Sequence, residues 1–145
     1  MGKSTVDPRV IATTSRLGVS PDFLNHNDLH IHVPAGAIPK DGPSAGVTMA
    51  TAILSALRNQ TVREDVAMTG EITLSGLVLP VGGIREKALA ARRHGIKEFI
   101  LPKRNEPDLA ELPAEVRETM HFVPVETLED ALAVSLPVPV PVPAT

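Results

Sequence analysis

The sequence contains no cysteine, tryptophan or tyrosine, and each absence excludes a kind of structure or function. Without cysteine, neither disulfide bonds nor thiolate metal sites can hold the fold, which suits a reducing compartment. With only 3 phenylalanines as aromatic residues, the platforms on which single-stranded nucleic acids stack are nearly absent. The formal net charge of −3 at pH 7 is too small to indicate a nucleic-acid or membrane surface. We therefore expect a domain that binds neither.

Long apolar runs are also absent. No run approaches the roughly 20 residues that span a bilayer, and the N-terminal stretch MGKSTVDPR lacks the apolar core of a signal peptide. We expect a bacterial cytoplasmic protein or, as a second choice, a protein of an organelle matrix. The 145 residues, with 43% apolar and 21% charged side chains, fit one globular domain.

Helical and alternating patterns follow one another along the chain, without an internal repeat or a domain boundary. They predict an α/β fold with a mixed sheet and flanking helices. The segment 44–58 is small or apolar nearly all round, so we expect it to be the buried central helix. Proline and glycine make 34–43 a loop long enough to be functional. Helices are expected at 9–17, 44–58, 82–94, 105–120 (broken at Pro113) and 126–136, and strands at 29–33, 66–74, 77–81, 98–101 and 121–125, with a two-residue turn at Ser75-Gly76.

Ser44 lies where the glycine-containing loop meets the helix 44–58. Unpaired backbone N–H groups and the positive end of the helix dipole gather at such a position. A hydroxyl there has oxyanion-stabilising donors nearby, as acyl transfer requires. The ordinary interpretation is a serine that only caps the helix, and the local pattern alone favours that interpretation by about three to one.

Lys87 lies at the edge of the apolar stripe that Ile84, Ala88 and Ala91 form on the helix 82–94. Burial beside that stripe disfavours the charged amine and lowers its pKa. Only a neutral amine can accept a proton from a serine hydroxyl. The alternative is a lysine whose stem covers apolar surface while its amine stays in water, and periodicity alone does not separate the two.

Two segments of this chain carry a family resemblance. PKDGPSAG around Ser44, and MTGEITLSGLVLPVGGIREK ending at Lys87, closely resemble the proteolytic domain of Lon, an ATP-dependent serine peptidase. The similarity runs from about Leu17 to Leu136, and the serine-to-lysine spacing, 87 − 44 = 43 residues, is that of the family. The joint motif reverses the balance that the local pattern left at Ser44.

The resemblance implies a role for each matching residue. Ser44 corresponds to the nucleophile and Lys87 to its general base, while Thr69 corresponds to a threonine that orients the lysine amine. Asp41, with Gly42 and Pro43, corresponds to the loop that switches the site between open and blocked shapes and borders the oxyanion site. No metal is implied.

The resemblance also implies a larger assembly. In the family, unfolded or damaged proteins and peptides are cleaved inside a homohexameric chamber. ATP and Mg²⁺ serve an ATPase module elsewhere in the parent protein, and the proteolytic domain itself uses no cofactor. The alternative interpretation is that the chain is a catalytically incompetent oligomerisation module of the same fold.

The resemblance divides the chain into an N-terminal segment at 1–16, the Lon-type domain at 17–136 and a proline-rich tail at 137–145, expected to be extended or disordered. The family has further strands upstream, and 1–16 is too short to hold them. We therefore expect a domain that lacks its N-terminal strands, through truncation or degeneracy.

Two weaker motifs complete the sequence. Residues 2–5 (GKST) look like the end of a phosphate-binding loop, but the first glycine and a preceding strand are missing. His30 and His32 share one face of the expected strand, with His26 nearby. A zinc site is conceivable there at about one chance in ten. A polar face near the substrate groove, or a subunit contact, is the ordinary alternative.

Overall fold

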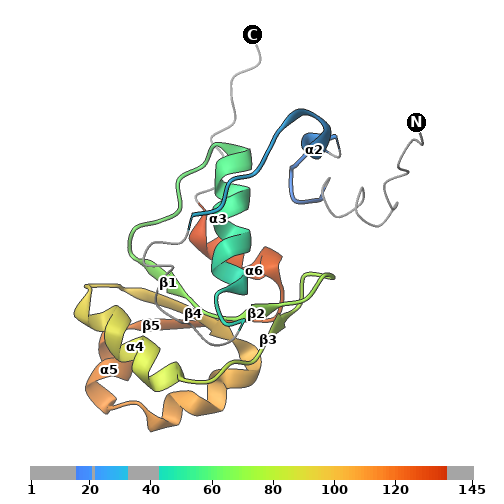
Figure 1. The fold of residues 1–145 in the computed structure, drawn as a ribbon. Helices are drawn as coiled ribbons and strands as arrows, with labels where there is room; N and C mark the ends of the chain where they lie inside the picture. The colour runs from blue at the N-terminus through green and yellow to red at the C-terminus, as the bar shows by residue number, and fades with distance from the viewer. Residues whose placement is uncertain (1–15, 21, 33–42, 137–145) are drawn as a thin grey trace. The chain divides into compact units, whose positions relative to one another are not determined.

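The computed structural model describes residues 16–20, 22–32 and 43–136, which fall into two compact units, one within Met1–Asp41 and one within Gly42–Thr145 (Figure 1). The expected helix 9–17, the GKST motif and the tail 137–145 lie wholly or mostly outside the described residues.

Among its described residues, the first unit contains the short helix α2 (Phe23–His26), and Arg16 is also helical. Gly18 has φ 72°, the left-handed conformation expected for a glycine that ends a helix. The prediction of a strand at 29–33 is wrong for residues 29–32, which have no regular structure, and Val33 lies outside the described part. Leu29 and Ile31 are 45% and 52% exposed, so the alternating pattern buries neither face there.

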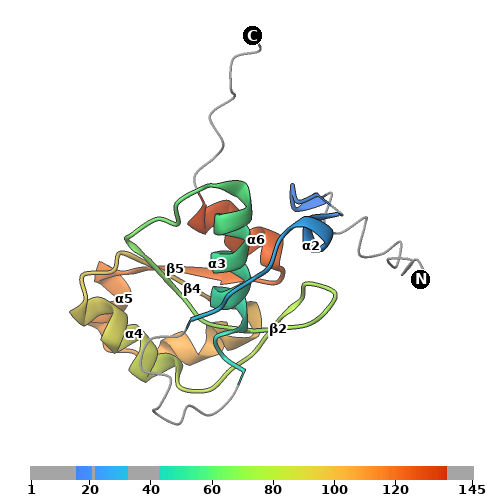
Figure 2. The ribbon, with the colours of Figure 1, turned by 45° about the horizontal axis from the view of Figure 1, so that its top comes forward.

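The second unit is built around a parallel sheet of order β1-β4-β5, which two groups of helices flank on its opposite faces (Figures 1 and 2). Helices α3 and α6 cover one face, and α4, η1 and α5 cover the other. This mixed α/β architecture confirms the predicted fold class. The elements are α3 (Gly46–Arg58), β1 (Val66–Met68), β2 (Glu71–Ile72), β3 (Val78–Leu79), α4 (Ile84–Arg93), β4 (Glu98–Pro102), η1 (Lys103–Glu111), α5 (Ala114–Thr119), β5 (His121–Val125) and α6 (Leu128–Ser135).

Strand β4 is the centre of the sheet because both of its faces are covered. It pairs in parallel with β1 and β5, Phe99 standing between Ala67 and Phe122. Phe99 and Leu101 are completely or almost completely buried in one apolar cluster, while Ile100, on the alternate face, is 0% exposed. A continuous apolar run is what a central parallel strand requires. The cluster on the α4 face contains Ile84, Ala88, Ala91, Phe99, Leu101, Leu112, Val116 and Met120.

The predicted strand 66–74 is two strands in the structure. The chain leaves the parallel sheet after Met68, passes through Thr69 and Gly70, and pairs β2 antiparallel with β3. Gly70 has φ 157°, and a Cβ atom there would lie 2.7 Å from Cγ1 of Val78. A side chain at position 70 is therefore excluded by both backbone and space.

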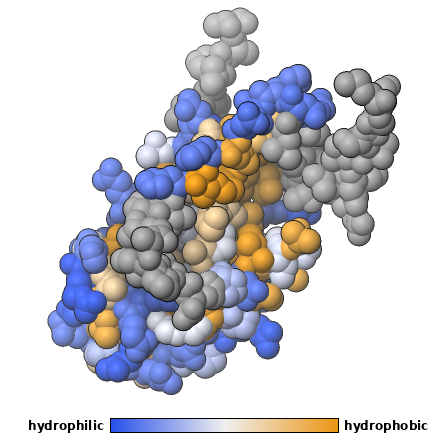
Figure 3. Space-filling view, in the orientation of Figure 1, coloured by the Kyte–Doolittle hydropathy of each residue, from blue (hydrophilic) through white to orange (hydrophobic). Residues whose placement is uncertain are grey.

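The β2–β3 hairpin closes with three residues and not with the predicted two. The backbone N–H of Thr73 donates to the carbonyl of Leu77 at 2.9 Å, and Gly76 takes the left-handed conformation with φ 85°. Leu74 is fully exposed at the tip, and Leu77 is 49% exposed. Figure 3 shows apolar side chains at the surface on the side of the molecule where this hairpin lies.

Helix α3 begins at Gly46, two residues later than predicted, with Ala45 as its N-cap. The prediction that it is buried all round is wrong. Only one face is buried, and the opposite face is open to solvent. The sequence does not distinguish the two faces because small alanine and threonine side chains occur on both. The buried residues are Val47, Thr51 and Leu54, and the exposed ones are Thr48, Met49, Ala52 and Ala56.

The C-terminal half agrees closely with the sequence. Helix α4 starts after Gly83 (φ 71°) and ends before Gly95 (φ 76°), as the paired glycines predict. The expected helix 105–120 is broken at Pro113, its first piece being the 3₁₀ helix η1. Helix α6 starts at a capping box in which Thr127 Oγ1 accepts from the N–H of Asp130.

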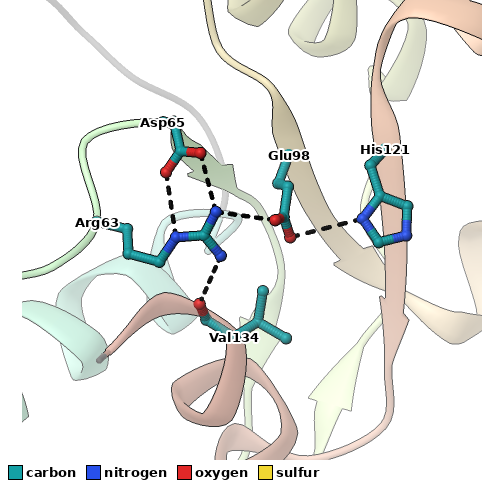
Figure 4. A network of polar contacts seen from close by, with 5 residues as sticks. All are labelled: Arg63, Asp65, Glu98, His121 and Val134. Atoms are coloured by element: carbon teal, nitrogen blue, oxygen red, sulfur yellow. Dashed lines mark hydrogen bonds and ion pairs between the residues drawn. The ribbon is translucent and has the colours of Figure 1, made fainter. Parts of the chain in front are cut away.

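The guanidinium of Arg63, which sequence reasoning did not single out, joins the loop before β1 to strand β4 and helix α6 (Figure 4). Arg63 donates from Nε and one terminal nitrogen to Asp65 at 3.1 and 2.9 Å. The same terminal nitrogen reaches Glu98 on β4 at 2.8 Å, and the other reaches the carbonyl of Val134 on α6 at 3.2 Å. The hydrogen-bonded Arg63 lowers the pKa of Asp65. Glu98 also faces Nδ1 of His121 at 3.6 Å.

Candidate active site

Ser44, Thr69 and Lys87 line the same surface pocket of about 560 Å³ in the second unit. The three residues come from different parts of the unit, namely the turn before α3, the residue after β1 and the fourth residue of α4. The rest of the wall is mainly apolar. It is formed by Ala45, Thr48, Ala67, Met68, Ala90, Ala91, His94, Ile96 and Phe99.

Ser44 is held by its backbone and does not cap the helix. The N-cap of α3 is Ala45, which makes no side-chain cap, so the ordinary interpretation of Ser44 as a capping serine does not fit. The Ser44 carbonyl accepts from the N–H of Gly70 at 3.0 Å and from Oγ1 of Thr69 at 3.3 Å. Its side chain is left at the half-buried wall of the pocket.

Thr69 is 3% exposed and stands between the other two residues. Its backbone N–H donates to the carbonyl of Ile100 at 3.0 Å, which fixes it to the central strand β4. Its hydroxyl donates to the Ser44 carbonyl and accepts from Nζ of Lys87, each at 3.3 Å. One buried hydroxyl therefore ties the lysine amine to the backbone of the serine.

Lys87 occupies the edge of the buried stripe of α4, as the helical periodicity predicts. Its amine donates to Oγ1 of Thr69 at 3.3 Å and to the carbonyl of Gly82 at 3.0 Å. Burial lowers the pKa of Lys87 because the charged amine loses solvation. Both side chains line the same pocket, and among the hydrogen bonds of the described residues none joins Nζ of Lys87 to Oγ of Ser44.

The backbone donors near Ser44 differ from those expected at a helix start. The first two amides of α3 already have partners: Gly46 donates to Pro43 and Val47 to Gly70, both at 3.0 Å. Pro43 has no N–H to offer. Asp41 and Gly42, the other members of the expected oxyanion or gating loop, lie outside the described residues.

The conceivable zinc site receives no support from the described residues. No group of three or more His, Cys, Asp or Glu side chains able to hold a metal occurs among them. His26, His30 and His32 all belong to this described part, and all three are exposed.

Two groups at or next to the segment that contacts Lys87 were not found by sequence reasoning. The Gly82 carbonyl is a backbone group, which carries no side-chain signal. Asn105 is 5% exposed and pairs with the backbone of Val81, next to Gly82. Asn105 stands in a polar segment, and its partner Val81 lies 24 residues away, so the sequence alone does not reveal the contact.

The fold and this pocket define a mixed α/β domain in which a serine, a threonine and a lysine line one pocket. A family model described as the Lon protease (S16) C-terminal proteolytic domain matches residues 5–138, and the chain therefore belongs to this family.

Individual relatives give the same result. The chain is 61% identical over 121 residues to a Lon protease of Syntrophus aciditrophicus and 62% identical over 122 residues to Lon protease 1 of Sorangium cellulosum. It is 57% identical over 121 residues to Lon protease 2 of Thermus thermophilus. These alignments cover 83–84% of the chain but only 15% of each relative, so the chain spans about a seventh of their length. Within the described residues, no helix is long and apolar enough to cross a membrane.

Proposed function

We propose that this domain is a serine endopeptidase in which Ser44 is the nucleophile and Lys87 the general base. The observation that carries the proposal is the environment of the Lys87 amine. It is partly buried, its pKa is lowered by lost solvation, and it shares a pocket with the half-buried Ser44. A neutral amine beside a serine hydroxyl is the pairing that lysine-dependent acyl transfer needs.

The hydrogen bonds of Lys87 suit a base. A neutral amine has two N–H donors and one lone pair, and Thr69 and Gly82 accept one donor each. The lone pair is then left free to accept a proton. We propose that the hydrogen bond between Nζ of Lys87 and Oγ of Ser44 forms when substrate binds, since catalytic hydrogen bonds are commonly long or poorly aligned without substrate.

Acyl transfer follows in two steps. Lys87 accepts the hydroxyl proton as Oγ of Ser44 bonds to a peptide carbonyl carbon, and returns that proton to the amine that leaves as the C–N bond breaks. In the second step the same amine takes a proton from water, whose oxygen bonds to the acyl carbon. Lys87 then returns that proton to Oγ of Ser44 as the C–O bond breaks and the acid is released. Backbone N–H groups of the 41–44 loop other than Pro43, which has none, are proposed to hold the oxyanion, with Asp41 gating the loop.

The whole-protein context is proposed from the family. Relatives named Lon protease are roughly seven times longer than the matched region. We infer that the parent protein uses ATP and Mg²⁺ in a separate module to deliver unfolded or damaged proteins to a homohexameric chamber in the bacterial cytoplasm. The domain itself is proposed to need no cofactor, and alone to cleave slowly and without ATP.

Cleavage of an unfolded protein such as casein, followed by mass spectrometry, tests the proposal. Ser44→Ala and Lys87→Ala are expected to abolish cleavage. Ser75→Ala and Lys97→Ala, which remove an exposed hydroxyl and an exposed amine outside the pocket, keep it. Unchanged cleavage in either Ser44→Ala or Lys87→Ala would show that the dyad is wrong.

A non-catalytic assembly module is the second candidate, and the exposed hairpin side chains Leu74 and Leu77 favour it. An active parent chain whose Ser44→Ala variant is inactive but associates unchanged excludes this candidate. A chain that associates through the hairpin and never cleaves supports it, with the Leu74→Ser variant as the control for association.

A further inference from the structure

Asn105 binds the backbone of a distant segment as a neighbouring strand would. Its Oδ1 accepts from the N–H of Val81 at 2.9 Å, and its Nδ2 donates to the carbonyl of the same residue at 2.8 Å. A further bond from Nδ2 to Asp108, at 2.7 Å, fixes the amide within η1. The side chain is 5% exposed, so these bonds form away from water, where an unpaired partner is costly.

The segment that Asn105 holds leads directly to the lysine amine. Val81 is followed by Gly82, whose carbonyl accepts from Nζ of Lys87 at 3.0 Å, and by Gly83, the N-cap of α4. The two glycines have no side chains to anchor them, and a Cβ at Gly82 would meet nothing within 4 Å. The two hydrogen bonds between the Asn105 side chain and Val81 therefore restrain the backbone next to the Gly82 carbonyl, which accepts from Lys87.

We propose that Asn105 is a positioning residue for Lys87, acting through the backbone of Val81 and Gly82. The inference rests on the proposed function, because it assigns Asn105 to the general base of that site. Asn105 itself does not line the pocket and touches neither Ser44 nor Lys87 among the contacts of the described residues.

The physical consequence concerns the direction and the solvation of the amine. When Thr69 and Gly82 both accept from the neutral amine, its lone pair has one direction left. Without Asn105 the Gly82 carbonyl is free to turn, so the amine rotates and gains water. Lost solvation is what lowers the Lys87 pKa, so added water brings that pKa back toward its ordinary value.

The test compares Asn105→Leu, which removes every bond at similar volume, with Asn105→Asp, which keeps an acceptor for the Val81 N–H but no donor for its carbonyl. Asp108→Ala is the matched control, because it removes one bond to Asn105 and leaves both bonds to Val81. Ser135→Ala is the control for stability alone, since it removes a buried hydroxyl of α6 outside the pocket. Far-UV circular dichroism establishes that each variant is folded, and Asn105→Asp serves if Asn105→Leu is not.

The primary measurement does not depend on activity. In the chain labelled with ¹³C at the lysine ε-carbons, the ¹³Cε resonance of Lys87, assigned with Lys87→Arg, is titrated by NMR. We expect the Lys87 pKa to rise in Asn105→Leu and in Asn105→Asp, where the charge of the new carboxylate adds to the rise, and to stay at the parent value in both controls. A parent-like Lys87 pKa in a folded Asn105→Leu chain, or an equal shift in Ser135→Ala, would overturn the inference.

Cleavage kinetics provide the second reading. We expect kcat to fall roughly 10- to 100-fold in Asn105→Leu with little change in KM, and the acid limb of the pH–rate profile to move to higher pH. If Lys87→Ala still cleaves, the proposed function fails, whereas the NMR titration still decides whether Asn105 positions the amine. If the dyad variants are inactive and Asn105→Leu retains the parent kcat and pH profile, the inference alone fails.

Discussion

The hydroxyl oxygen of Thr69 lies 3.3 Å from Nζ of Lys87, and the same hydroxyl donates to the carbonyl of Ser44. Thr69 is in turn bonded to the central strand through the carbonyl of Ile100. The lysine amine and the serine carbonyl are thus hydrogen-bonded to the same buried hydroxyl, which the backbone of Thr69 anchors to the central strand. Rigid placement of this kind is what a base that approaches its nucleophile only with substrate requires.

Replacing Thr69 separates positioning from folding. Thr69→Val keeps the branched shape but removes the acceptor of Nζ, so kcat for casein cleavage is expected to fall roughly tenfold or more with KM little changed. Thr69→Ser retains the hydroxyl and is expected to stay within a few-fold of the parent chain. Equal activity of the valine and serine variants would contradict a positioning role.

Lys87 is expected to cost stability at neutral pH. Its folded-state pKa is lowered, so between that value and the unfolded value of roughly 10.4 the unfolded chain binds more protons. Stability therefore rises with pH through this window. Lys87→Met should raise Tm by roughly 1–3 °C at pH 7, and the gain should vanish as the pH approaches 10.4.

Thermal melts of Lys87→Met and of the exposed Lys97→Met, recorded across this pH range, check that sign. Lys97→Met removes an exposed lysine outside the pocket and serves as the control for the loss of a lysine side chain. A Lys87→Met chain that is less stable than the parent at pH 7, or whose gain grows with pH, would refute the assigned cause.

Gly70 marks the break that brings Thr69 to the site, and a side chain there is expected to be costly. Gly70→Ala places a Cβ 2.7 Å from Cγ1 of Val78 at φ 157°, which should destabilise the chain by about 1–3 kcal/mol. Denaturant unfolding measures the loss. Gly82→Ala, where nothing lies within 4 Å of the added Cβ, should change stability far less.

A double variant isolates the steric part of that loss. Val78→Ala removes the atom that the new Cβ meets, so Gly70→Ala/Val78→Ala should lose less stability than the sum of the single variants. Strict additivity of the two changes would mean that the contact with Val78 is not the reason for glycine.

The Arg63 network is expected to stabilise the second unit in a pH-dependent way. Arg63→Ala should lower Tm more than Arg117→Ala, which removes an exposed arginine of α5. Because Arg63 lowers the folded pKa of Asp65, their pairing contributes above the unfolded carboxyl value of roughly 3.9 and is lost as the pH falls through the folded value. The Tm difference between parent and Arg63→Ala should therefore shrink below about pH 4; a difference that stays constant to pH 2 would exclude this origin.

The sequence predicts the C-terminal half of the fold well because its signals are local. Gly83 precedes α4 and Gly95 follows its C-cap, so glycines mark both ends of this helix. Strand β4 is almost continuously apolar, as a strand covered on both faces requires. The break of the strand 66–74 is not predictable in this way, because the alternating pattern continues through Thr69 and Gly70 while the pairing partner changes from β4 to β3. Small side chains likewise hide which face of α3 is buried.

In the candidate site, too, the features with a local sequence signal are predictable and those that depend on tertiary contacts are not. Periodicity places Lys87 at the edge of its buried stripe, and the structure confirms that placement. At Ser44 the local pattern favours a helix cap, and only the joint motif overrules it. The contacts of Lys87 with Gly82, and of Asn105 with Val81, join groups whose meeting depends on tertiary structure and involves the backbone, so no side-chain pattern announces them.

The pH dependence of casein cleavage by this chain, measured beside Lys87→Ala, tests the central claim most directly. The assignment of Lys87 as the base predicts a rate that rises with the loss of one proton, at a pH well below the roughly 10.4 of a free lysine, and no cleavage in Lys87→Ala. Cleavage that persists in Lys87→Ala with the same pH profile would contradict it.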